Sequence, residues 1–236
     1  MRLVVAVAYL DRREWSADTV WASVRFAFEL LVRGLAGDRG RDLAAHVALR
    51  FEDVTDTAML ARIAKYVPAH DHSPNFFVDI LSNGNHGVSH WDDDSTWWGK
   101  WSNIRAEMYT VRNVDEYGIR RAFDYIMDLV EARAPYDSCV NLNSVLLWPC
   151  RCRPYGCFGG SGVTCVYAVL TALAAARDAY DPNVERVLGI PRRVALAARL
   201  PRVMIKELLR ARVLYDVPHI VGRGDSNVAQ MPLLTI

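Results

Sequence analysis

Residues 158–176 read FGGSGVTCVYAVLTALAAA, a glycine-rich loop followed by an apolar run that predicts a helix from about Val163 to about Ala179. The glycines have no Cβ atom, so another backbone can approach the loop closely. Cys165 falls in the first turn of this helix, where unpaired backbone N–H groups and the positive end of the helix dipole favour an anion. These conditions favour a reactive thiolate. Cys165 is therefore the candidate nucleophile, and the alternative is a buried thiol that packs like a small hydrophobic residue.

A nucleophilic cysteine requires an imidazole base, and His46 is the best placed histidine. Residues 43–52 read LAAHVALRFE and alternate between two faces, which predicts a half-buried strand. The small Ala44 and Ala48, predicted on the same face as His46, leave room for the end of a helix. The alternative is a histidine on the face of a half-buried strand whose hydrogen bonds are satisfied and which has no catalytic role. The other histidines lie in predicted turns and loops, where a base is less rigidly held: His70, His72, His86, His90 and His219.

The third member of such a site is an acid that orients the imidazole. Asp79 interrupts the apolar strand FFVDIL, and an acid in that position costs free energy unless it has a partner. Glu52 is the second choice, because it lies at the end of the His46 strand and is expected to meet solvent.

Periodicity and turn signals predict an α+β fold with an antiparallel sheet covered by helices. Asn113 and Glu116 have the spacing of a capping box at the start of one helix. Residues 219–236 are expected to be irregular. Strands are predicted at 3–9, 43–52, 75–81 and 104–111, and helices at 16–35, 56–67, 113–134 and 163–179 and from Pro191 and Pro201 onward.

The predicted elements divide the chain into three parts. Residues 1–40 are interpreted as an N-terminal strand–helix appendage, ending in the loop GLAGDRGR. Residues 41–180 form the main domain, and residues 181–236 form a helical tail with an irregular C-terminal arm.

The order of these features resembles the circularly permuted papain-like (NlpC/P60-type) cysteine hydrolases of bacteria and several large-virus groups. The resemblance covers about residues 43–173. It rests on HVALRF at the histidine strand, FFVDI at the acidic strand, a tryptophan-containing stretch, APYD, and the glycine-rich loop before the cysteine helix. In that family the histidine strand precedes the cysteine helix, as it does here.

The resemblance implies roles for individual residues. Cys165 takes the place of the nucleophile, His46 that of the base and Asp79 that of the orienting acid. Tyr136 and Asp137 match a Tyr-Asp pair that the family often carries before the cysteine. Val166 stands where a serine commonly follows that cysteine.

The expected function is a thiol hydrolase, an amidase, peptidase or ester hydrolase, that acts on a peptide, amide or ester without a cofactor. The competing hypothesis is a non-catalytic structural component of a large assembly, such as a virus capsid, that makes protein–protein contacts and retains a vestigial site. The two terminal segments, which have no counterpart in the family, motivate this second hypothesis.

Composition excludes other classes. The chain has 236 residues, of which 52% are hydrophobic and 23% charged, as in globular domains rather than disordered chains. The net charge of +1 gives no reason to expect a nucleic-acid partner, although arginines are dense in the tail. No membrane span is expected, because the most apolar stretch, 163–176, is too short. Five cysteines and a first apolar run broken by charges predict an intracellular or virion-associated protein without a signal peptide.

Three weaker motifs remain open, and none leads us to predict a metal site. Trp91–Trp101 forms either an aromatic platform with a hard-cation site or a turn anchored to the core. The Arg-Gly-Asp tripeptide at 223–225 is either an adhesion motif or a turn. Four cysteines are either zinc ligands or fill small niches in a loop: Cys139, Cys150, Cys152 and Cys157.

Overall fold

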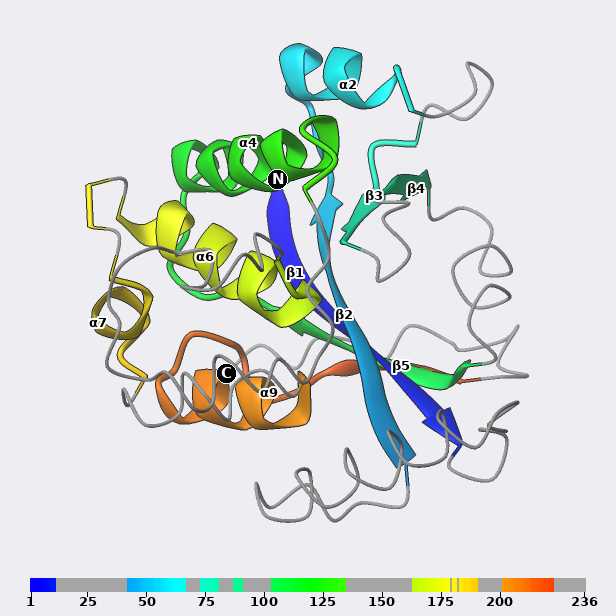
Figure 1. Ribbon diagram of the computed structural model, residues 1–236, viewed down its shortest axis with the longest axis vertical. Helices are drawn as coiled ribbons and strands as arrows, with labels where there is room; N and C mark the ends of the chain where they lie inside the picture. Colours follow the sequence, from blue (N-terminus) through cyan, green and yellow to red (C-terminus); the bar gives the residue numbers. More distant parts are fainter. Residues whose placement is uncertain are drawn as a thin grey trace.

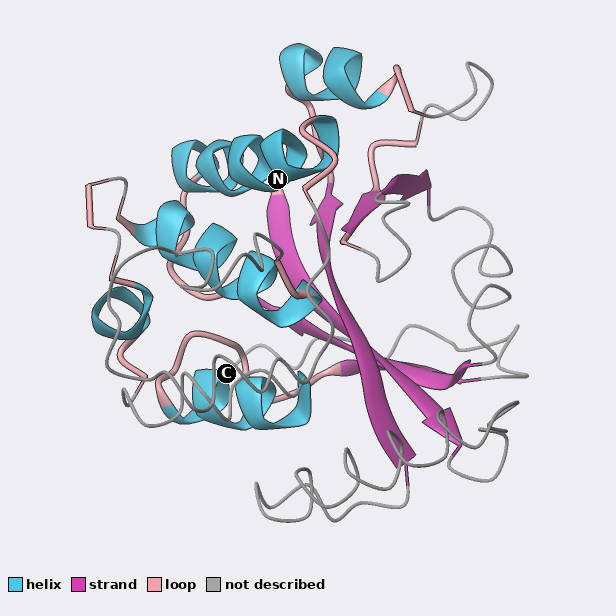
Figure 2. Ribbon diagram, viewed as in Figure 1, coloured by secondary structure: helices cyan, strands magenta, loops and turns pink. Residues whose placement is uncertain are grey.

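The computed structural model describes residues 1–11, 42–66, 73–80, 87–90, 103–134, 163–178, 180–181, 183–190 and 201–222. These segments form an α+β structure (Figures 1 and 2). The described elements in chain order are β1 (Arg2–Asp11), β2 (Asp42–Glu52), α2 (Thr57–Ile63), β3 (Phe76–Asp79), β4 (Gly87–His90), β5 (Asn103–Thr110), α4 (Glu116–Glu131), α6 (Cys165–Arg177), α7 (Val184–Leu188), α9 (Pro201–Arg210) and β6 (His219–Gly222).

The described strands form one antiparallel sheet with the order β4-β3-β2-β1-β5-β6. The predicted antiparallel sheet is therefore confirmed. β1 pairs with β2 on one side and with β5 on the other, so it is an interior strand of the sheet. At the other end of the chain, β6 pairs with β5 in the same sheet. The strands of the first and last predicted parts thus share one sheet with the middle part.

A β-bulge interrupts the long pairing of β1 with β2. Ala8 pairs with His46 but Tyr9 pairs with Ala44, which leaves Ala45 as the extra residue on β2. The predicted alternation holds from His46 onward, where Val47 belongs to the large core and Ala48 to a smaller cluster on the opposite face.

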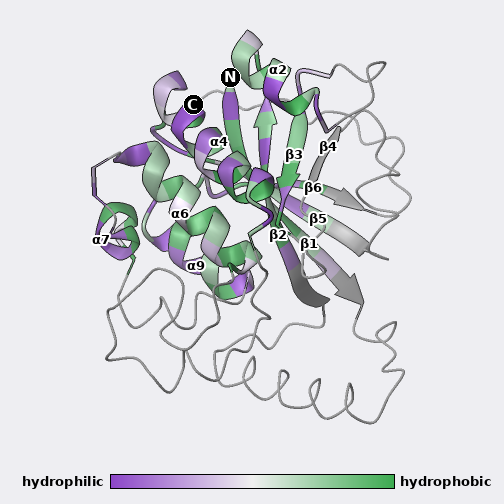
Figure 3. Cartoon of the chain, turned by 45° about the horizontal axis from the view of Figure 1, so that its top comes forward, coloured by the Kyte–Doolittle hydropathy of each residue, from purple (hydrophilic) through white to green (hydrophobic). Residues whose placement is uncertain are grey.

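The helices α4, α6 and α9 pack on one face of the sheet, with α6 between the other two (Figure 1). α6 carries mostly hydrophobic residues along its length (Figure 3), and its apolar side chains join the large core. The centre of that core holds three phenylalanine rings: Phe51 and Phe76 stack at 5.3 Å, and Phe123 of α4 meets both edge-on. Apolar burial on this scale anchors α6 firmly over the sheet.

The C-terminal end of α6 is held closely against α4. Gly118 lies in the first turn of α4, where a Cβ atom would come within 2.3 Å of the carbonyl oxygen of Ala176. Arg121 donates hydrogen bonds to the carbonyl oxygens of Ala175 and Ala176, at 2.7 and 2.8 Å. These two carbonyls belong to the last turn of α6, where no further backbone N–H groups of the helix are available to donate to them. Gly118 and Arg121 therefore fix the position of α6 relative to α4.

Several predicted element boundaries differ in the structure. Asn113 does not cap α4: its φ of 55° is left-handed, whereas an N-cap is extended. Asp115 takes that role and accepts a hydrogen bond from the Gly118 N–H. The segment expected to be irregular begins with β6, and β4 and α7 were not predicted, because each is only four or five residues long.

Several predictions fall outside the described residues: the helix at 16–35, the helix after Pro191, the tryptophan-rich stretch, Tyr136, Asp137 and the Arg-Gly-Asp motif. Within the described segments, no helix has both the length and the apolar character needed to cross a bilayer.

Candidate active site

Three separate elements bring Cys165, His46 and Asp79 together. His46 lies in β2, next to the bulge at Ala45. Asp79 is the last residue of β3, the strand that pairs with β2, and Cys165 is the first residue of α6, which contacts β2. Bulges re-aim side chains and are frequent beside active sites. The sheet and the helix that crosses it therefore place a thiol, an imidazole and a carboxylate in one location.

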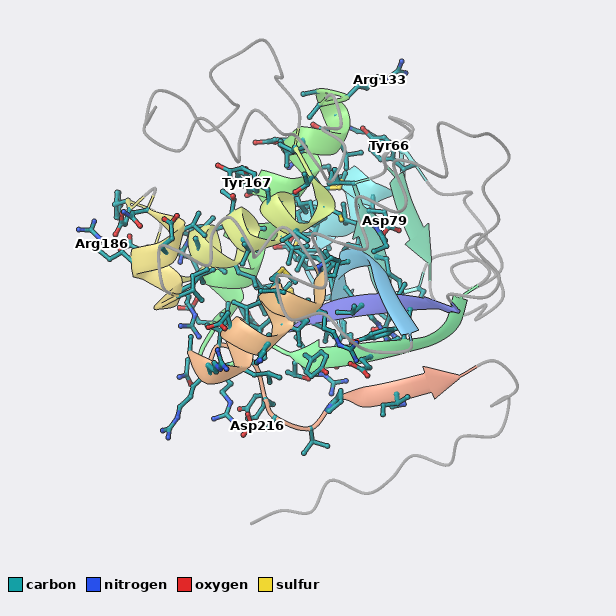
Figure 4. All side chains as sticks on the ribbon, turned by 60° about the horizontal axis from the view of Figure 1, so that its bottom comes forward. Tyr66, Asp79, Arg133, Tyr167, Arg186 and Asp216 are labelled. Carbon is teal, nitrogen blue, oxygen red and sulfur yellow. The ribbon has the colours of Figure 1, made fainter. Side chains whose placement is uncertain are left out.

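The contact between His46 and Asp79 is a short, buried hydrogen bond. The distance between His46 Nε2 and Asp79 Oδ1 is 2.8 Å, and both side chains are 8% exposed. Figure 4 shows Asp79 within the body of the molecule, in contrast to Arg133, Arg186 and Asp216 at its periphery. A carboxylate in this position fixes the orientation of the ring and stabilises its protonated form.

Cys165 forms a side-chain hydrogen bond with the same imidazole. Because Nε2 faces Asp79, Nδ1 is the ring nitrogen left for the thiol. Burial by itself lowers the pKa of His46, but the hydrogen bonds with Asp79 and Cys165 outweigh burial and raise this pKa to about 10. A protonated imidazole beside a thiol favours the thiolate. The arrangement thus fits a thiolate–imidazolium pair.

The surroundings of Cys165 reinforce this tendency. Cys165 is 2% exposed, and it lies at the N-terminal end of a helix of 13 residues, where the helix dipole favours negative charge. Burial by itself opposes the charged form of a thiol, so the helix dipole and the imidazolium must outweigh it, and both effects are stronger in a buried location than in water. A nucleophile, a base that contacts it and an acid that orients the base are the parts needed for nucleophilic catalysis.

Glu52 and His219, two other candidates from the sequence, lie away from His46. Glu52, the second choice for the acid, forms ion pairs with Arg2 and Arg50, each at 3.1 Å. His219 is exposed in β6, at the edge of the sheet farthest from β3, and His90 lies in β4. The four candidate zinc ligands at 139–157 lie outside the described residues. Within the described residues no group of three His, Cys, Asp or Glu side chains is arranged to hold a metal ion.

Thr164 is a residue of this site that the sequence analysis missed. It is the N-cap of α6, and its hydroxyl accepts a hydrogen bond from the Tyr167 N–H at 3.0 Å. The signal was present, because a threonine directly before an apolar helical run is a common N-cap. The predicted start near Val163 placed Thr164 inside the helix instead.

Comparisons of the chain with protein-family models, with curated proteins and with solved structures find no match. The function is therefore argued from the geometry of the site.

The raised pKa of His46 predicts a stability that depends on pH. Between 6.5, the ordinary pKa, and about 10, the His46 side chain holds a proton in the folded protein that the same side chain has released in the unfolded chain. The contribution of His46 to stability is therefore complete below pH 6.5 and is lost as the pH rises through about 10.

Asp79→Asn is the matched variant for this effect, because it keeps a hydrogen-bond acceptor beside the ring and removes the charge. Urea unfolding of the wild type and of this variant at pH 6, 8 and 10 measures the effect. Both proteins keep Cys165, so the difference between their free energies of unfolding reports on the contact of imidazolium with carboxylate. This difference should shrink toward pH 10, and a constant difference contradicts the prediction.

Proposed function

We propose that the protein is a thiol hydrolase that cleaves an amide or ester bond with Cys165, His46 and Asp79. The observation that carries the proposal is the convergence of two side chains on the His46 imidazole: Asp79 lies 2.8 Å from Nε2 and Cys165 bonds to the same ring. The finer assignment of the α+β fold to the permuted papain-like class is part of this proposal. It is supported by the order of the elements, with the histidine strand and the acidic strand before the cysteine helix.

The proposed reaction has two steps. The Cys165 thiolate attacks the carbonyl carbon of the substrate, and a thioester forms as the bond to the amine or alcohol breaks. The His46 imidazolium gives its proton to the leaving group. Water then attacks the thioester while His46 takes up a proton from it, and the acid leaves with Cys165 regenerated.

Two features of the chain support charge stabilisation during these steps. The N-terminal end of α6 places the positive end of its dipole beside the reacting sulfur. The carbonyl oxygen of the substrate becomes the oxyanion of the tetrahedral intermediate next to this sulfur, so the dipole favours its charge. Asp79 is hydrogen-bonded to the ring and orients and stabilises the imidazolium that each step requires.

Covalent labelling tests the proposal. We expect chloroacetamide at pH 6 to modify Cys165 before the other four cysteines, as measured by mass spectrometry of digested peptides. With p-nitrophenyl acetate we expect an acetyl group on Cys165 and release of p-nitrophenol beyond one equivalent per chain. The variant Cys165→Ser should lose both signals, whereas the exposed-histidine variant His219→Gln should keep them.

Equal labelling of all five cysteines contradicts the proposal. Absence of labelling at Cys165 in the folded protein, with labelling after unfolding, supports the competing hypothesis of a structural protein with a vestigial site.

A further inference from the structure

We propose that Thr164 is a positioning residue that sets the reactivity of Cys165. This inference rests on the proposed function and deepens it, because it names the group that holds the nucleophile. Thr164 is 7% exposed and directly precedes Cys165 in the chain. No chemistry is assigned to Thr164 itself, which acts through the first turn of α6.

The contacts of Thr164 bridge the whole first turn of the helix. Its backbone has the extended conformation of an N-cap, with φ −90° and ψ 159°. Its hydroxyl accepts the Tyr167 N–H at 3.0 Å, and its carbonyl oxygen accepts the Ala168 N–H at 2.9 Å. A second hydroxyl bond, from Thr171 to the Tyr167 carbonyl at 2.9 Å, continues along the same helix. Together these bonds keep Cys165 at the first helical position.

The consequence for Cys165 is electrostatic as well as steric. Helix ends fray when the cap is removed, and the dipole acts only within the first turn. A frayed turn would move the sulfur away from the His46 ring and weaken the positive potential around it. Since both effects favour the thiolate, loss of the cap should raise the pH at which Cys165 ionises.

The test measures the rate of iodoacetamide alkylation at Cys165 as a function of pH, with the modified peptide identified by mass spectrometry. Thr164→Val keeps the shape of the side chain but not the acceptor oxygen. We expect this variant to raise the midpoint of the pH profile of alkylation by about 0.5 pH unit. Thr164→Ser should restore the wild-type midpoint, because serine caps equally well. The matched control is Asp56→Ala, which removes the N-cap of α2 and should leave the midpoint unchanged.

An unchanged midpoint in Thr164→Val overturns the inference, as does an equal shift in Asp56→Ala, which would show a general effect of lost stability. If Thr164→Val does not fold, Thr164→Asn is the second variant. Asparagine keeps a capping side chain, so the midpoint should stay close to that of the wild type. A midpoint more than one pH unit above that of the wild type then overturns the inference. A wild-type midpoint near 8.5, the ordinary thiol value, overturns the proposed function as well. If the wild-type midpoint is low and the Thr164→Val midpoint is equally low, only the positioning role of Thr164 is overturned.

Discussion

Replacing His46 by glutamine should lower the rate of alkylation of Cys165 at pH 5 by about 30-fold. Thiols paired with a histidine typically have a pKa near 4, and a thiol of this kind is almost fully ionised at pH 5. Without the imidazolium, an ordinary thiol is ionised to only about 0.03% at pH 5. The more basic thiolate is intrinsically about 100-fold more nucleophilic, which offsets part of this loss.

The same substitution should reduce hydrolysis of p-nitrophenyl acetate by about 10²- to 10⁴-fold, because the base for the second step is also lost. Stopped-flow absorbance measures the hydrolysis, and peptide mapping measures the alkylation. His219→Gln, at an exposed position in β6, is the matched control and should behave as the wild type. If His46→Gln keeps the wild-type pH profile of alkylation, the imidazole does not activate the thiol.

Much of this site was predictable from local physical chemistry. Asp79 stood out because a carboxylate in an apolar strand is costly without a partner, and the structure supplies that partner in His46, 33 residues earlier in the chain. Cys165 stood out because the sequence marks the start of a helix, and α6 does begin at that residue. Both arguments need only the sequence within a few residues of the position concerned.

Features set by distant parts of the chain were not predictable in this way. Nothing in the local sequence of β1 shows that it lies between β2 and β5, because its pairing depends on where those strands run. The bulge at Ala45 leaves no mark in the alternating pattern of residues 43–52 and is visible only in the register with β1. β4 and β6 are too short for a periodic pattern and are defined by their partners.

The second prediction concerns stability, and it links the fold to the site. Gly118→Ala should lower the free energy of unfolding by about 3 kcal/mol, although alanine is a better helix former than glycine. A Cβ atom at this position would meet the Ala176 carbonyl oxygen at 2.3 Å and a Val114 methyl group at 2.8 Å. Backbone cannot yield as a flexible side chain does, so α4 and α6 must separate. The separation also strains the hydrogen bonds of Arg121 to the end of α6.

Gly189→Ala is the matched control, because it adds the same methyl group where the nearest atom lies 3.9 Å away. Its φ of +69° makes alanine cost about 1 kcal/mol through backbone conformation alone. Urea unfolding should therefore show a larger loss in the free energy of unfolding for Gly118→Ala than for Gly189→Ala. A smaller loss in Gly118→Ala contradicts the packing argument. We expect a displacement at Ala176 to be transmitted along the 13 residues of α6 to Cys165 at its other end. We therefore expect Gly118→Ala, but not Gly189→Ala, to slow alkylation of Cys165 at pH 5 under conditions in which both variants are folded.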